Sequence, residues 1–194
     1  MSRHARAGSL HQATRMSLPA ALPNAAGWML ASAPARVLAD YYLAARGDRA
    51  VLRRADFDPA ALKSILPRLF LLELRSVQEL HIRLAGSCLA NRTGRELTGL
   101  DWLDLIGPAQ RAARGAAFAR MAGEPIGLRA VARYPATLGE DIIVEYLSLP
   151  LTPVRGDEPP MAIGVVASLW RPPGAKPMPF HQGNEEITPL PLAR

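Results

Sequence analysis

Side chains capable of chemistry are few and scattered in this sequence. The one cysteine, Cys88, allows no intramolecular disulfide and no metal site built from several cysteines. The four histidines lie far apart and form no ligand pair at helical spacing. Asp101 and Asp104 are three residues apart, but no histidine or nucleophile accompanies them, so we interpret them as a capped, solvated helix face. With no phosphate loop or nucleophile elbow either, the sequence predicts a protein that is not an enzyme.

Four residues could instead line a binding pocket: Cys88, Trp102, Phe118 and Tyr146. Cys88 is interpreted either as a pocket-lining or redox-sensing thiol or, by preference, as a small buried hydrophobe, because little in its neighbourhood would activate a thiol. Trp102 and Phe118 could line a cavity or belong to an ordinary core. The same alternatives apply to Tyr146, whose hydroxyl would need a partner if buried.

The net charge of +6 is concentrated at the chain ends. The first 36 residues carry four arginines and no acid, and residues 171–194 add one further net positive charge. The middle of the chain is therefore almost neutral, and no nucleic-acid partner is expected. No segment approaches the roughly 18 apolar residues of a membrane span, so no membrane partner is expected either. A single cysteine suggests a reducing compartment, and we predict a cytoplasmic location.

Composition divides the chain into three parts. Residues 1–33 predict a disordered basic leader, preferred over a signal peptide because Pro19, Pro23 and Asn24 interrupt the apolar stretch. Residues 34–171 predict one folded domain, and residues 172–194 a disordered, proline-rich tail. The domain is expected to keep its stability when both ends are removed.

The apolar period changes along the domain. A helix is predicted over residues 34–46, with Val37, Leu38, Tyr41 and Ala45 as its stripe, and a short helix after Asp58. Strands are predicted at 68–75, 80–84, 126–133, 141–151 and 161–170, with turns at 138–140 and 155–157 closing the last two hairpins. Between the second and third strands, a helix over 108–121 would place a small-residue face on the sheet: Ala109, Ala112, Ala116 and Ala119. This order indicates an α+β fold, with an antiparallel sheet and helices on one face.

Several blocks, in this order, resemble a subfamily of short, stand-alone PAS proteins from alphaproteobacteria. They are LADYY at 38–42, RG at 46–47, RADFDP at 54–59, LPRLFLLE at 66–73, RLAGS at 83–87, RELTG at 95–99 and EYLSLPL at 145–151. The resemblance implies a five-stranded antiparallel PAS sheet with an extra N-terminal helix. It also implies a sensory or adaptor module that acts in bacterial signalling through protein contacts and is gated by a small ligand. A carrier protein for small molecules, without signalling output, is the alternative.

Cofactors of other PAS proteins leave sequence marks that this chain lacks. Flavin-binding light sensors of this fold keep the motif Asn-Cys-Arg-Phe-Leu-Gln, whereas the thiol here lies in GSCLAN at 86–91. Haem-binding members offer a histidine on the connecting helix, and residues 108–121 contain none. We therefore expect neither flavin nor haem, which leaves an unidentified small apolar ligand as the open case.

A protein partner is expected at the N-terminal helix or on the outer face of the sheet. Leu38, Tyr41 and Tyr42 add up to more apolar surface than one face of a short helix can bury, which favours a homodimer contact. The alternative is that Tyr42 and Leu43 pack against the sheet of their own chain.

Overall fold

Five antiparallel strands form the centre of the fold in the computed structural model, which describes residues 18–135, 141–171, 174 and 184–192. They are β4 (Leu69–Ser76), β5 (Glu79–Ala85), β6 (Ile126–Tyr134), β7 (Ile142–Thr152) and β8 (Met161–Trp170). Their order across the sheet is β5-β4-β8-β7-β6. The apolar periods thus predicted all five strands and the antiparallel sheet. The turn predicted at 138–140 lies outside the described residues.

Further strands extend this sheet. β9 (Asn184–Pro191) pairs with β6 in an antiparallel ladder, and β3 (Leu52–Arg53) pairs in parallel with the end of β7. β1 (Leu22–Pro23) and β2 (Met29–Leu30) form a small separate hairpin. The other elements are α1 (Ala33–Arg46), η1 (Arg54–Asp56), η2 (Pro59–Leu62), η3 (Leu66–Arg68), α2 (Ser87–Thr93), η4 (Trp102–Leu105) and α3 (Pro108–Gly123).

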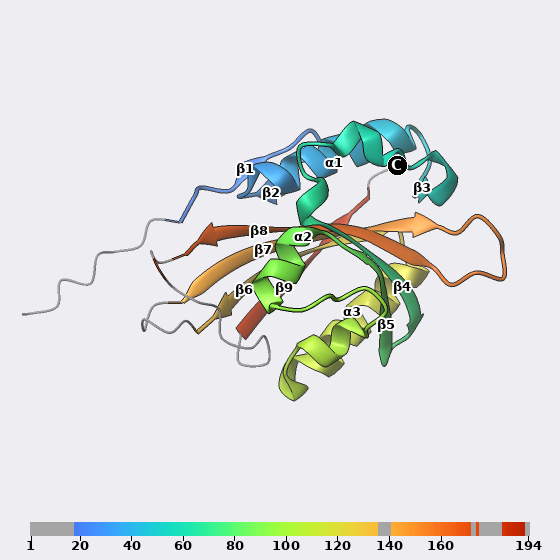
Figure 1. Cartoon of the computed structure of the whole chain (residues 1–194). Helices are drawn as coiled ribbons and strands as arrows, with labels where there is room; N and C mark the ends of the chain where they lie inside the picture. The colour runs from blue at the N-terminus through green and yellow to red at the C-terminus, as the bar shows by residue number, and fades with distance from the viewer. Residues whose placement is uncertain (1–17, 136–140, 172–173, 175–183, 193–194) are drawn as a thin grey trace, which may run out of the picture.

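Helices cover both faces of the sheet, with α1 above it and α3 below it in Figure 1. Alternate residues of each strand supply the two cores, as a pleated strand requires. The inner face, which carries Phe70 and Tyr146, packs against α2, η4 and α3. The outer face, which carries Leu71 and Leu147, packs against α1 and the β1–β2 hairpin. The middle helices therefore share one face as predicted, while the N-terminal helix occupies the other.

The buried stripe of α1 differs from the predicted one. Ser32 caps the helix by accepting a hydrogen bond from the Ala35 N–H, and Gly47 ends it at a φ of 55°. Val37, a member of the predicted stripe, is 39% exposed, and Tyr41 and Ala45 are only half-buried. The stripe that faces the sheet is shifted to Ala35, Leu38, Ala39, Tyr42 and Arg46. The two alanines of this stripe let the helix lie close to the sheet. Apolar spacing alone did not distinguish this stripe from the predicted one.

This packing corrects the predicted dimer contact. Leu38 and Tyr42 are completely buried within their own chain and offer no free surface. The Tyr42 hydroxyl donates to the Pro150 carbonyl at 2.8 Å and accepts from the Leu52 N–H at 3.3 Å. Tyr41 is half-buried, and its ring meets Phe57 edge-on at 5.9 Å. The structure thus shows the alternative for Tyr42, which is packing on the sheet of its own chain.

The small-residue face of α3 also points the other way. Ala109, Ala112, Ala116 and Ala119 are exposed. The buried side of α3 consists of Arg114, Gly115, Phe118 and Met121. A Cβ on Gly115 would lie 1.9 Å from the Val77 carbonyl oxygen, so glycine permits the close approach of α3 to the β4–β5 turn. The larger side chains then fill the space over the sheet.

Both predicted domain boundaries were too narrow. Trp28 and Leu30, inside the predicted leader, are buried in the outer core. Residues 184–191, inside the predicted tail, form β9, and Leu190 and Leu192 are buried. The Trp28 indole donates to the Pro191 carbonyl at 3.1 Å and joins the two ends. Ordered residues at both ends thus complete the outer core.

Tyr42→Phe is expected to make the protein less sensitive to alkali. Burial, chiefly, raises the pKa of Tyr42 to about 12, from 10.0. The unfolded chain therefore ionises first, and the stabilisation is complete below pH 10 and is lost as the pH rises through 12. At pH 11 this loss is about 1.4 kcal/mol of unfolding free energy. Urea unfolding followed by tryptophan fluorescence should show a smaller decrease from pH 8 to pH 11 in Tyr42→Phe than in wild type.

The same substitution should lower stability by about 1 kcal/mol at pH 8, because the Pro150 carbonyl and the Leu52 N–H lose their partner. An equal alkaline loss in wild type and Tyr42→Phe would contradict the prediction.

Candidate functional site

Three of the four predicted pocket residues meet on the inner face. The Trp102 ring lies 4.8 Å from the Phe70 ring and 6.0 Å from the Tyr146 ring, measured between centroids. Phe118 of α3 belongs to the same buried cluster. These residues fill the inner core with aromatic side chains.

Cys88 lies apart from them. It is half-buried near the start of α2 and lines a surface groove of about 280 Å³. The other lining residues are Arg68, Asn91, Arg92, Ile142 and Arg171. The predicted four-residue pocket is therefore corrected to three core residues and one residue of a separate, largely polar groove.

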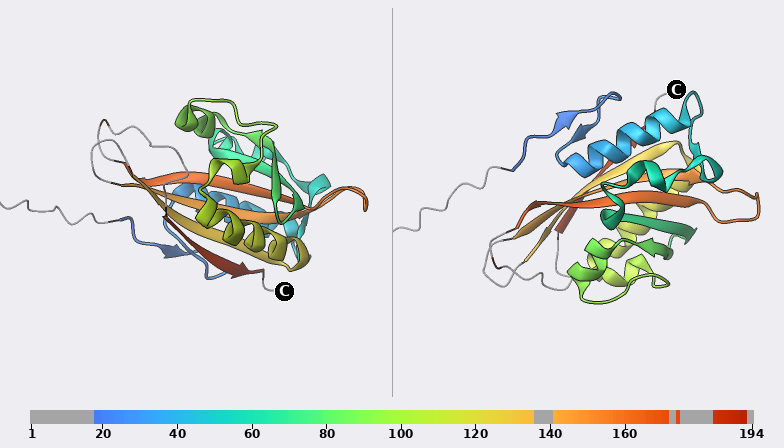
Figure 2. Two further views of the ribbon diagram at one scale, coloured as in Figure 1. Left: turned by 90° about the horizontal axis from the view of Figure 1, so that it is seen from below. Right: turned by 45° about the horizontal axis from the view of Figure 1, so that its top comes forward.

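A buried ion pair lies beside the aromatic cluster and was not predicted from the sequence. Arg114 of α3 is 3% exposed, and its guanidinium pairs with the carboxylate of Glu185 on β9. α3 lies along the inner face beside β9 (Figure 2). The guanidinium carbon also lies 5.7 Å from the centre of the Tyr146 ring. The pair connects the inner helix to the last strand through the core.

Two tyrosines complete this polar part of the core. The hydroxyls of Tyr134 and Tyr146 are 3.1 Å apart, and the Arg92 guanidinium lies 4.9 Å from the centre of the Tyr134 ring. Burial, and then the neighbouring Tyr146, raise the pKa of Tyr134 well above its usual value, although Arg114 and Arg92 oppose the rise. Tyr134 is therefore neutral at physiological pH. Such a group can donate a hydrogen bond but cannot act as a base.

The cavity beside the buried ion pair is small. The cavity between Arg114, Phe118, Tyr146 and Glu185 has a volume of about 10 Å³, which is the space for one water molecule. Among the described residues, neither the Trp102 indole N–H nor the Arg114 Nε has a hydrogen-bond partner. These two buried donors lie next to the same tyrosine ring. This part of the core thus has two unpaired donors, beside a cavity of very small volume.

A flavin does not fit the cavity beside Tyr146. Cofactor-sized ligands occupy about 300–1,000 Å³, far more than the cavity beside Tyr146 provides. The lone thiol, Cys88, belongs to the separate groove.

A second buried carboxylate lies on the outer face. Glu145 of β7 accepts hydrogen bonds from the Ala31 N–H at 3.0 Å and the Ser32 N–H at 2.7 Å. It also accepts one from the Arg129 Nε at 2.7 Å. Glu145 thereby fixes the start of α1 to the sheet. Its position within an otherwise apolar run, 142–151, was a sequence signal that could have indicated a buried charge.

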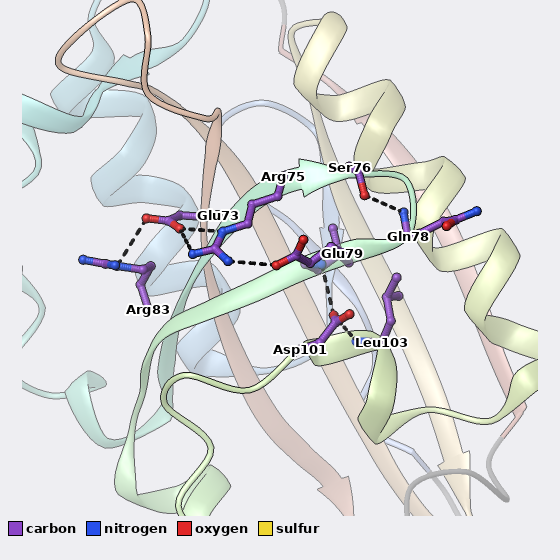
Figure 3. A network of polar contacts seen from close by, with 9 residues as sticks. Glu73, Arg75, Ser76, Gln78, Glu79, Arg83, Asp101 and Leu103 are labelled. Carbon is purple, nitrogen blue, oxygen red and sulfur yellow. Dashed lines mark hydrogen bonds and ion pairs between the residues drawn. The ribbon is translucent and has the colours of Figure 1, made fainter.

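Charged residues on the β4–β5 hairpin form an exposed network (Figure 3). Glu73 pairs with Arg75 at 3.0 Å and with Arg83 at 3.3 Å, and Arg75 also pairs with Glu79. Asp101 accepts hydrogen bonds from the Leu80 and Leu103 N–H groups, which confirms its interpretation as a cap. These contacts are structural and bring no reactive groups together.

No group of three or more metal-ligating side chains occurs within the described ranges 18–135, 141–171, 174 and 184–192. Over the same part of the chain, no helix has the length and apolar character needed to cross a membrane.

Two solved structures show partial similarity to this chain. The Rhodobacter sphaeroides LOV protein is 21% identical with a TM-score of 0.39, and the match covers 54% of this chain and 60% of that chain. The structure of VqmA bound to DPO is 14% identical with a TM-score of 0.39, over 57% of this chain and 56% of that one. This chain thus spans less than two thirds of either protein. No curated protein matches.

A sequence profile of the PAS domain matches residues 30–167, from the end of β2 into β8. Because this match covers most of the chain, the protein belongs to the PAS domain family.

Proposed function

We propose that this protein is a non-enzymatic sensory module that acts in bacterial signalling through protein contacts and is gated by a small ligand. PAS domains are generally sensory modules, which supports this class of function. The inner face favours recognition over catalysis, because the Tyr134 phenol stays neutral and, among the described residues, no nucleophile stands beside a base. A cytoplasmic location is proposed because a free thiol such as Cys88 persists in a reducing compartment.

The buried pair of Arg114 and Glu185 carries the proposal. A buried ion pair adds little to net stability compared with apolar packing, whereas removal of one partner costs about 3–5 kcal/mol. Whether β9 stays in place therefore depends strongly on which group pairs with the Arg114 guanidinium. A ligand that reaches the inner face could change the edge of the sheet by this route.

The alternative function, a carrier for small molecules, has weaker support. A carrier must enclose its ligand, and the space beside Phe118 and Tyr146 is about 10 Å³. A native mass spectrum of the purified protein would separate the two. A small molecule retained at one equivalent per chain would favour the carrier, and a bare protein the sensor.

The protein contact is proposed on the outward side of α1. Val37 is 39% exposed there, and Met29 on the preceding hairpin is 49% exposed. These apolar side chains replace Leu38 and Tyr42 as candidates for a homodimer contact, because exposed apolar side chains are typical of interaction surfaces. The neutral centre of the chain continues to favour a protein partner over nucleic acid.

Light scattering on three proteins tests this contact. Wild type is expected to be a dimer at micromolar concentration, and Val37→Glu a monomer, because a charge on the contact must be desolvated. Val154→Glu, at a valine that is 62% exposed in the β7–β8 connection, is the matched control and should remain a dimer. A monomeric wild type, or a Val37→Glu variant that still dimerises, would overturn the contact.

A further inference from the structure

Arg114 has more binding capacity than the structure uses. Its guanidinium has five N–H donors, of which the Nε has no hydrogen-bond partner among the described residues. The walls around it are largely apolar and include Phe118, Leu128 and Ile187. An arginine in such surroundings binds a carboxylate best, because two parallel hydrogen bonds neutralise its charge. Glu185 supplies that carboxylate in the present arrangement.

The strand that supplies Glu185 is held unevenly. β9 is an edge strand, and among the described strands it pairs with β6 alone. Its second half is fixed by the buried Leu190 and by the Pro191 carbonyl, which accepts from the Trp28 indole. The first half, Glu185 to Ile187, depends on the β6 ladder and on Arg114. A competitor for Arg114 would therefore release only this first half, as a local opening of the sheet edge.

Charge and size define the competitor. The pair of Arg114 and Glu185 is neutral as a whole, so a monoanion can replace Glu185 without leaving a net charge in the core. A dianion would leave an unpaired negative charge, which is costly in a buried site. The cavity adds only about 10 Å³ to the volume of the displaced side-chain group. The fitting ligand is thus a carboxylate with a very short apolar body.

We infer that Arg114 binds a small aliphatic monocarboxylate in place of Glu185, and that this exchange releases the first half of β9. The inference rests on the proposed sensory function and names the ligand class of its input site.

Glu185→Ala tests the binding step, because the group that this substitution removes has the size of acetate. The variant should melt on the order of 10 °C below wild type, since Arg114 loses its partner. Sodium acetate should raise its melting temperature by about 3 °C or more relative to sodium chloride at equal ionic strength. Acetamide, which has the same shape but no charge, should give no increase.

The double variant Arg114→Met/Glu185→Ala is the matched control, and acetate should not stabilise it. Binding at Arg114 is overturned if acetate acts no better than chloride on Glu185→Ala. It is equally overturned if acetate stabilises the double variant to the same extent.

Hydrogen exchange on wild type tests the release step. Acetate should increase the exchange rates of the Glu185 to Ile187 amides several-fold relative to chloride, while the amides of β4 keep their rates. Arg114→Met should show no effect of acetate. Rescue of Glu185→Ala without faster exchange in wild-type β9 would overturn the release.

The two proposals fail separately. If acetate has no effect but wild type dimerises through Val37, the ligand class is wrong and the proposed protein contact stands. If acetate acts as described on a monomeric wild type, the contact is wrong and the ligand site stands.

Discussion

A chain that ends at Gly174 is expected to lose cooperative unfolding. Without β9, the charge of Arg114 stays buried with no partner, at a cost of about 3–5 kcal/mol. The outer core loses Leu190 and Leu192, and each buried leucine contributes about 2 kcal/mol or more. The sum is comparable to the whole stability of an ordinary domain, which is about 5–15 kcal/mol. The β6 ladder also loses its partner strand and presents an open edge.

Urea unfolding followed by circular dichroism measures this effect. A chain that ends at Leu192 keeps all of β9 and is the matched control, so it should unfold with the same midpoint as the full chain. Should the chain ending at Gly174 unfold at nearly the same urea concentration as the full protein, the C-terminal domain boundary predicted from composition, residue 171, would be correct after all.

The sequence predicted the central strands because their signal is local. β7 and β8 are buried on both faces, so each appears as one continuous apolar run of β-branched residues and leucine. β9 has no such signal. Its residues, NEEITPLP, resemble a proline-rich tail, and only its distant partner β6 makes it a strand. Its prolines suit an edge strand. Proline has no N–H to donate to a neighbouring strand, and an edge strand has a neighbour on one side only.

Helix faces were harder to assign than helices. Pro108 and Pro34 marked the beginnings of α3 and α1 well. For α3, a face of alanines resembled a packing surface, yet the true one contains Arg114 and Gly115. A charged residue is normally assigned to the solvent side. Arg114 is buried only because Glu185, far away in the sequence, reaches it from β9, and spacing within one helix cannot reveal such a partner.

Glu145→Ala is expected to destabilise the protein by about 3–5 kcal/mol, the cost of leaving a charge partner and buried donors unpaired. Three groups lose their acceptor: the N–H groups of Ala31 and Ser32, and the guanidinium of Arg129. The first two are buried backbone N–H groups. A neutral water molecule is a weaker hydrogen-bond acceptor for them than the charged carboxylate. Urea unfolding at pH 7 measures the loss.

Glu79→Ala is the matched control, because Glu79 also pairs with an arginine, at 2.8 Å, but its side chain is 47% exposed. Its loss should be at most about 1 kcal/mol, as for other surface pairs. Hydrogen exchange then locates the effect: the amides of Ala31 and Ser32 should exchange much faster in Glu145→Ala, because the start of α1 is no longer fixed to β7. Equal losses in the two variants would mean that the buried carboxylate does not hold the helix. A larger loss with faster exchange at Ala31 would instead show that the Glu145 carboxylate holds the start of α1 on the sheet.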